Sequence, residues 1–272
     1  MVDVVALADE LRQAYAEGHT LAVPPSARAG GLGLDAAYAV EQELVRRRRA
    51  DGRRTVGLKV GYANKAVWRA LKLDTLVWAH MYDDTVSFAE GGTGSHSLGR
   101  TRTPKIEPEI VFKMRHALAP GTTDPTAVLE SVEWLALGFE IIDCVYADWT
   151  FGVADFVAAY GLHTALVVGD PMPVAPASIP ALAEALPRFT VTLACDGYTV
   201  EEGSGRNALR SPALCLGELA TALSRRAGAE PLVPGDLVSS GTLTESRPIA
   251  PGHSWTAVVD GIGLPTLTLN LC

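Results

Sequence analysis

Apolar residues recur every three or four positions in the first quarter of the chain, which is the spacing of one helix face. The first expected helix carries this pattern on Val4, Leu7, Leu11 and Tyr15. Beyond a stretch rich in Pro and Gly, the pattern predicts two more helices and a strand between them, at about 35–49, 65–71 and 55–61. We assign residues 1–75 to an N-terminal helical region packed on the rest of the chain.

From residue 76 onward, short apolar segments alternate with turns rich in Gly, Pro and Asp, which is typical of strands. One more helix fits 213–226, and the expected strands are 106–114, 134–145, 165–168, 189–195, 237–240, 254–259 and 267–271. Short strands with few long helices between them favour a mixed α/β (α+β) fold with a β-roll or sandwich core over a doubly wound parallel sheet. Residues 76–272 form this core, which can count as one domain with the helical region.

Composition narrows the class of protein. Hydrophobic residues make up 48% of the 272 positions and charged residues 20%, as in a packed globular protein. A net charge of −8 makes nucleic acid and anionic membranes poor partners. No apolar run approaches the roughly 20 residues that span a bilayer, and the chain starts directly with an amphipathic pattern, so we expect a cytoplasmic protein. The basic run at 46–49 is expected to be a solvated helix end or a subunit contact.

Two glutamates lie two positions apart on the expected strand that contains the sequence KIEPEIVF. Alternate residues of a strand share a face, so Glu107 and Glu109 lie together, with Lys105, opposite an apolar face. Pro108 cannot donate to a ladder, which predicts an edge strand or a break in the ladder. Two neighbouring carboxylates repel each other unless a cation lies between them or they stay in water. A solvated strand face is therefore the alternative to a metal site.

A third glutamate favours the metal. Glu140 stands in the middle of a nearly continuous apolar run, as in a strand that is buried on both faces. A buried, ionised carboxylate needs a cation, because burial without one costs several kcal/mol or more. An arginine or lysine can serve, but so can a metal shared with the other two glutamates. Oxygen ligands of this kind suit Mg²⁺ or Mn²⁺ better than zinc.

Two further segments offer polar groups. Lys59 stands between glycines in a short apolar strand, where it can neutralise a carboxylate or act as a base; the alternative is a surface lysine. Ser240, Gly241 and Thr242 end another strand and can offer hydroxyl and N–H donors to a substrate carboxylate. Taken alone, this second segment is equally compatible with an ordinary turn.

Together these segments resemble the fumarylacetoacetate hydrolase superfamily, most closely its branch of 2-keto-4-pentenoate hydratases and 4-oxalocrotonate decarboxylases. The order and spacing of several motifs carry the resemblance over nearly the whole chain. They are DAAYAV at 35–40, VGLKVG at 56–61, PKIEPEI at 104–110, EWLALGFE at 133–140, ADW at 147–149, GD at 235–236 and DGIG at 260–263.

The resemblance implies a mixed β-roll core and a divalent metal, Mg²⁺ or Mn²⁺, held by the three glutamates. It places Lys59 near the reacting carbons of a small 2-oxo acid and the 240–242 segment at the substrate's carboxylate or oxo end. Asp83 or Asp84 falls where the family carries an acidic loop near the site. It also implies a homo-oligomer, a dimer or higher, that can associate with another enzyme of its pathway.

Two stretches depart from the pattern of the hydratases. AYGLH at 159–163 replaces an Asp-Asn pair followed by small residues, and RSP at 210–212 replaces Gly-His-Pro. His163 is therefore a candidate acid or base in the pocket, and a hydrogen-bonded structural histidine is the alternative. Both departures bear on the exact reaction rather than on the metal site.

The implied chemistry is a metal-stabilised enolate formed from a 2-oxo acid, with Lys59 moving the proton. Three outcomes can follow: hydration of a double bond, loss of CO₂, or C–C hydrolysis of an acylpyruvate or fumarylacetoacetate type. We expect a hydratase, that is a hydro-lyase, of aromatic-compound catabolism, because the resemblance to that branch runs along the whole chain. Two alternatives from other functional classes remain: a weakly active partner subunit, and a protein in which the acidic cluster is purely structural.

Overall fold

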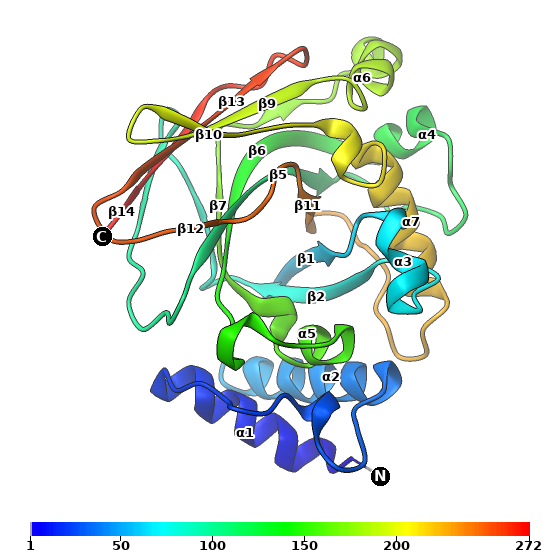
Figure 1. Ribbon diagram of the computed structural model, residues 1–272. Helices are drawn as coiled ribbons and strands as arrows, with labels where there is room; N and C mark the ends of the chain where they lie inside the picture. Colours follow the sequence, from blue (N-terminus) through cyan, green and yellow to red (C-terminus); the bar gives the residue numbers. More distant parts are fainter. Residues whose placement is uncertain (1) are drawn as a thin grey trace.

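Two β-sheets organise the computed structural model, which describes residues 2–272 (Figure 1). The larger, nine-stranded sheet has the order β2-β1-β11-β5-β6-β7-β3, with β8 beside β6 and β12 beside β5. Its strands are β1 (Thr55–Gly61), β2 (Val77–Tyr82), β3 (Val86–Phe88), β5 (Lys105–Met114), β6 (Val132–Ile142), β7 (His163–Val168), β8 (Met172–Pro173), β11 (Leu237–Thr242) and β12 (Arg247–Pro248).

The smaller, five-stranded sheet has the order β10-β9-β13-β14-β4. Its strands are β4 (Thr93–His96), β9 (Thr190–Cys195), β10 (Tyr198–Ser204), β13 (Ser254–Asp260) and β14 (Leu267–Leu271). The α-helices are α1 (Val4–Glu17), α2 (Leu34–Ala50), α3 (Lys65–Leu71), α4 (Pro125–Glu130), α5 (Val153–Ala158), α6 (Ile179–Ala185) and α7 (Pro212–Ser224). Among the described residues, no helix is both long enough and apolar enough to cross a membrane.

One face of the large sheet is divided into an apolar part and a polar part. The apolar part is a buried cluster of side chains from five strands, Met81, Val111, Ala136, Leu166, Val168 and Leu237. Strand registers continue the same face along β5, β6 and β1 to Glu109, Glu140 and Lys59. The opposite face, which carries Ile110 and Phe112, belongs to the main hydrophobic core. The carboxylates thus extend a packed apolar layer, which holds them on rigid strands.

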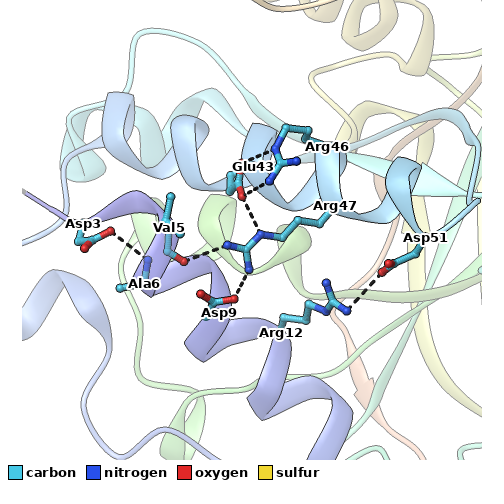
Figure 2. A network of polar contacts seen from close by, with 9 residues as sticks. All are labelled: Asp3, Val5, Ala6, Asp9, Arg12, Glu43, Arg46, Arg47 and Asp51. Carbon is cyan, nitrogen blue, oxygen red and sulfur yellow. Dashed lines mark hydrogen bonds and ion pairs between the residues drawn. The ribbon is translucent and has the colours of Figure 1, made fainter.

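Helices α1 and α2 pack together at one end of the molecule, beside α5 (Figure 1). Figure 2 shows the polar contacts around them. Arg47 of α2 pairs with Asp9 of α1, and its Nε lies 2.7 Å from Glu43 on its own helix. Arg12 reaches Asp51 at 3.4 Å. Only 12% of the Arg47 side chain is exposed. The expected solvated helix end is therefore wrong for Arg47, because α1 supplies an acidic partner, Asp9, that the local sequence does not reveal. The alternative for this run, a subunit contact, stays a prediction.

Most of the expected elements are found within a few residues of their predicted bounds. The expectation that Pro108 marks an edge strand is wrong, because β5 lies between β6 and β11. The alternative, a break in the ladder, is found on one side of Pro108, where the neighbour of β5 changes from β11, which pairs up to Glu109, to β12, which pairs from Ile106; pairing with β6 continues through Pro108. The strand β1 belongs to the large sheet, so a boundary at residue 75 would separate it from its neighbours β11 and β2. The mixed α/β fold with a β-rich core is confirmed.

The close approach of β1 to β11 can be tested by a substitution at Gly57. Its φ is 144°, and a Cβ there would lie 1.8 Å from the Leu237 carbonyl oxygen. We expect Gly57→Ala to lower the free energy of unfolding by about 3 kcal/mol, the upper end for overpacking, as measured by urea denaturation. Gly33→Ala is the control, because Gly33 has a φ of −85° and no atom within 4 Å of an added Cβ. Equal losses in the two variants would contradict the close approach.

Candidate metal centre

Strand pairing brings the three glutamates together. Glu107 on β5 lies directly opposite Glu140 on β6, and Glu109 follows on the same face of β5. One carboxylate oxygen from each residue can be chosen so that all three lie within 4.8 Å of one another. Glu109 and Glu140 are buried, whereas Glu107 is half-buried at the wall of a cavity. Like charges directly opposite each other on neighbouring strands are destabilising, so this arrangement requires positive charge.

The electrostatics of the three carboxyls differ. Burial raises the pKa of Glu107 and of Glu109, and the neighbouring carboxylates raise them further. Burial also acts to raise the pKa of Glu140, but Lys59 and His163 outweigh it and hold that pKa below its ordinary value. Glu140 is therefore ionised, and the other two carboxyls lose their protons readily only when more positive charge is nearby.

Lys59 supplies part of that charge. Its buried Nζ lies 2.9 Å from Glu140 Oε2 and donates a hydrogen bond to the Gly161 carbonyl at 3.0 Å. Burial acts to lower the pKa of Lys59, but the three glutamates raise it overall, so the side chain is an ammonium. Three carboxylates and one ammonium leave two negative charges, which one divalent cation balances.

One oxygen of Glu109 is held and the other is free. Oε2 accepts hydrogen bonds from Ser239 Oγ at 2.6 Å and from the Gly241 backbone N–H at 2.8 Å. Oε1 is buried and has no hydrogen-bond partner. Buried carboxylate oxygens are rarely left without a partner. The free Oε1, next to two further carboxylates, fits a hard cation such as Mg²⁺ or Mn²⁺.

The 240–242 segment contributes differently from the prediction. A β-bulge sets two residues of β11, Ser240 and Gly241, against one residue of β5, so the Gly241 N–H points at Glu109. Gly241 and Thr242 line the cavity. Ser240 is buried and does not line it, because strand alternation turns it to the other face. Ser239 was not among the predicted site residues. Its role follows only from the pairing of β11 with β5, which places Ser239 on the same face as Glu109.

The structure does not bring the remaining predicted residues to the substrate side. Asp83 and Asp84 lie in the turn between β2 and β3, where Asp83 pairs with Arg54 and Asp84 with Arg48. His163 Nδ1 lies 2.9 Å from Glu140 Oε1, and its Nε2 lies 2.9 Å from Thr85 Oγ1. None of the three lines the cavity beside the carboxylates. His163 thus orients Glu140, which is the structural alternative for this histidine.

A cavity of about 590 Å³ opens in front of the glutamates. Its aromatic wall consists of Tyr62, Trp149, Phe151 and Phe156. Lys105 also lines it, with Nζ 3.8 Å from the centre of the Trp149 ring. Among the described residues, no carboxylate lies within 4.0 Å of the Lys105 ammonium. The cavity therefore combines a carboxylate cluster, an aromatic wall and one unpaired cation.

Comparison with known proteins shows the family to which this architecture belongs. The family model described as fumarylacetoacetate (FAA) hydrolase C-terminal matches residues 82–269, which include all three glutamates. The chain belongs to the fumarylacetoacetate hydrolase family.

Curated relatives of the family cover nearly the whole chain. A 2-keto-4-pentenoate hydratase from Paraburkholderia xenovorans is 30% identical over 258 residues, covering 94% of this chain and 91% of the relative. A 4-oxalocrotonate decarboxylase from Pseudomonas sp. (strain CF600) is 28% identical, covering 95% and 94%. The crystal structure of 4-oxalocrotonate decarboxylase from Pseudomonas putida G7, complexed with magnesium and adipate, superposes with a TM-score of 0.87. It is 25% identical and the match covers 99% of this chain and 97% of that one. The chain thus shares its fold with a 4-oxalocrotonate decarboxylase over nearly its whole length, and its sequence is similar to relatives of two different activities.

The charge balance at the glutamates can be tested by thermal unfolding. We expect saturating Mg²⁺ or Mn²⁺ to raise the Tm by about 5 °C, since a ligand at 100 times its Kd adds about 2.7 kcal/mol. EDTA should reverse the shift. In Glu109→Gln the shift should vanish, while the metal-free variant unfolds no earlier than metal-free wild type because a carboxylate repulsion is removed.

The matched control is Glu133→Gln, because Glu133 lies on β6 but its carboxylate forms an ion pair with the half-exposed Lys113 and belongs to no carboxylate cluster among the described residues. It should keep the full response to the metal. A normal metal shift in Glu109→Gln would remove this residue from the metal site.

Proposed function

We propose that the protein is a divalent-metal-dependent enzyme acting on a small 2-oxo acid, and that it hydrates a dienoate of the 2-keto-4-pentenoate type. The observation that carries the proposal is the cluster of three glutamates with a single buried lysine at the wall of a substrate-sized cavity. Membership of the family and the similarity to 2-keto-4-pentenoate hydratases over 94% of the chain support it.

Glu107, Glu109 and Glu140 would hold the ion. Bound there, Mg²⁺ or Mn²⁺ would supply Lewis acidity that polarises the 2-oxo group of the substrate. The hydrogen bonds from Ser239 and Gly241 fix Glu109, so its free oxygen stays in place without reorganisation. His163 does the same for Glu140. These three contacts preorganise the ligands on β5 and β6.

Lys59 is the proposed proton carrier. An ammonium has three N–H donors; one of them donates to the Gly161 carbonyl, and Nζ lies 2.9 Å from Glu140 Oε2 in an ion pair. Lys59 also lines the cavity, where its ammonium can donate a proton to the carbon next to the 2-oxo group. The flat aromatic wall beside it suits a planar conjugated acid.

A second candidate function rests on Lys105. An unpaired cation on the cavity wall suits a substrate with a second, distal carboxylate, as in a 4-oxalocrotonate-type decarboxylase or an acylpyruvate-type C–C hydrolase. Lys105 lies two residues from Glu107 on the same strand face, so about 7 Å separates their Cα atoms. Lys105, Glu107 and Glu109 line the same cavity, so a short dicarboxylate bound at the glutamates would have Lys105 beside it.

Substrate profiling separates the two candidates. The Mg²⁺-loaded and Mn²⁺-loaded protein is assayed with 2-hydroxypentadienoate, 4-oxalocrotonate and fumarylpyruvate, and products are identified by mass spectrometry. Hydration of the first compound supports the proposal. Turnover of only a dicarboxylate, with a KM that rises at least tenfold in Lys105→Met, would replace it by the second candidate. A protein that is inactive on every compound and co-purifies with a pathway enzyme would be a partner subunit.

Lys59→Met tests the proton carrier. We expect the variant to keep the metal-induced rise in Tm and to lose at least 100-fold in kcat, because proton transfer by a positioned side chain typically contributes that much. Lys65→Met is the control, since Lys65 lies in the first turn of α3 and contacts only Trp68. An unchanged kcat in Lys59→Met would remove this lysine from the mechanism.

A further inference from the structure

Trp149 and Lys105 meet at the wall of the substrate cavity, although they come from segments far apart in the chain. Lys105 begins β5, and Trp149 ends the 3₁₀ turn Ala147–Trp149 between β6 and α5. The Lys105 Nζ lies 3.8 Å from the centre of the Trp149 ring. Trp is the best aromatic partner for an ammonium in a cation–π contact. The indole face therefore attracts the Lys105 charge to this wall.

The place of the Lys105 ammonium is not the one that charge alone would choose. Lys105 and Glu107 occupy alternate positions of β5 and so share a strand face. The flexible stem of a lysine can bring its ammonium to a neighbouring carboxylate, which would attract it. Among the described residues, however, no carboxylate lies within 4.0 Å of this ammonium, which lies on the indole instead. The contact with Trp149 accounts for this separation.

Trp149 adopts a backbone conformation that a bulky side chain disfavours. Its φ is 53°, and the preceding residue, Asp148, has a φ of 53° as well. For bulky residues the left-handed region is a rare and strained choice. Such strain persists only where the surrounding structure over-determines it, and it is found mainly at active sites and ligand-binding sites. A strained indole at a cavity wall therefore points to a function for its placement.

The surroundings hold the indole at its polar edge. Its Nε1–H donates a hydrogen bond to Thr103 Oγ1 at 2.9 Å. Thr103 is held in turn, because its backbone N–H and that of Arg102 donate to the buried Asp143 carboxylate at 2.9 Å and 3.0 Å. The segment before β5 thus contacts the indole twice, at its edge through Thr103 and at its face through Lys105.

We propose that Trp149 is a positioning residue that holds the Lys105 ammonium at the cavity wall beyond Glu107, where this charge selects 2-oxo acids with an anionic far end. Lys105, Glu107 and Glu109 follow one another at alternate positions of β5, about 7 Å apart, so the ammonium lies to one side of the glutamates. A distal carboxylate would meet a charge that is already in place, which lowers the entropic cost of binding.

This inference rests on the proposed binding of a 2-oxo acid at the three glutamates. It concerns binding at the cavity wall and not the bond that is made or broken. It therefore applies to a hydratase as well as to a decarboxylase or a C–C hydrolase, and it can be tested without turnover.

The experiment compares two ligands of the Mg²⁺-loaded full-length protein by titration calorimetry. The probes are 2-oxoadipate and 2-oxohexanoate, which have equally long carbon chains, but only the first carries a distal carboxylate. We expect wild type to bind 2-oxoadipate about fivefold more tightly or better, because hydrogen bonds between charged groups are strong. In Trp149→Leu this preference should be lost, since the ammonium is no longer held at the wall. Trp149→Phe keeps an aromatic face and should retain most of the preference.

A double variant tests whether Trp149 acts through Lys105. Lys105→Met should lose the preference for 2-oxoadipate, and adding Trp149→Leu should change the ratio of the two Kd values by less than about twofold, because the charge that the indole positions is already absent. A purely structural role for Trp149 would instead weaken the binding of both acids together and leave their ratio unchanged.

Trp134→Leu is the matched control. Trp134 is half-buried like Trp149, but it lines a different cavity, beside Phe88. Its substitution should leave the ratio of the two Kd values at the wild-type value.

Three results would overturn the role of Trp149 alone. They are a wild type without preference for 2-oxoadipate, a wild-type ratio in Trp149→Leu, and losses of preference in the two single variants that multiply in the double variant. A wild type that binds neither acid in the presence of Mg²⁺ would overturn the proposed 2-oxo acid function, and the inference with it. This last result is distinct from the other three, in which at least one acid binds.

Discussion

The repulsion among three glutamates on two adjacent strands is the constraint around which the site is built. Glu107 faces Glu140 across the ladder and Glu109 follows two residues away, in a part of the protein with little water. Such a cluster survives only with compensating charge and hydrogen bonds. Lys59 provides one positive charge, and Ser239 and Gly241 hold one oxygen of Glu109. The free oxygen and the two remaining charges account for why the site suits a divalent ion.

The sheet makes this cluster possible by dividing one face between two kinds of residue. The apolar part of the face, which includes Val111 and Leu237, is packed and buried. The polar part follows directly along the same strands. The close approach of β1 to β11 at Gly57 sets Lys59 beside Ser239. Packing energy at one end of the strands therefore fixes the geometry of charges at the other end.

Glu140 lies between two cavities of the molecule. Lys59 approaches one of its oxygens from the substrate cavity, and His163 approaches the other from the cavity beneath α1 and α2. Arg48 and Arg47, from the basic run of α2, line this second cavity and are paired with Asp84 and Glu43. A single imidazole thus lies between this cavity and Glu140, one of the three proposed metal ligands.

Local pattern determined much of this protein. Alternation along one strand puts Glu107 and Glu109 on one face, and the apolar run around Glu140 required a cation, because both arguments depend only on neighbours in the chain. The roles of Asp83, Asp84, Ser240 and His163 depended on contacts between distant segments. Asp84 pairs with an arginine 36 positions away, Ser239 faces Glu109 because β11 inserts between β1 and β5, and His163 turns to Glu140 from β7. The sequence by itself determined which side chains are charged, buried or alternating. Only the tertiary structure decided which of them meet, because strand pairing joins residues whose separation in the chain carries no local signal.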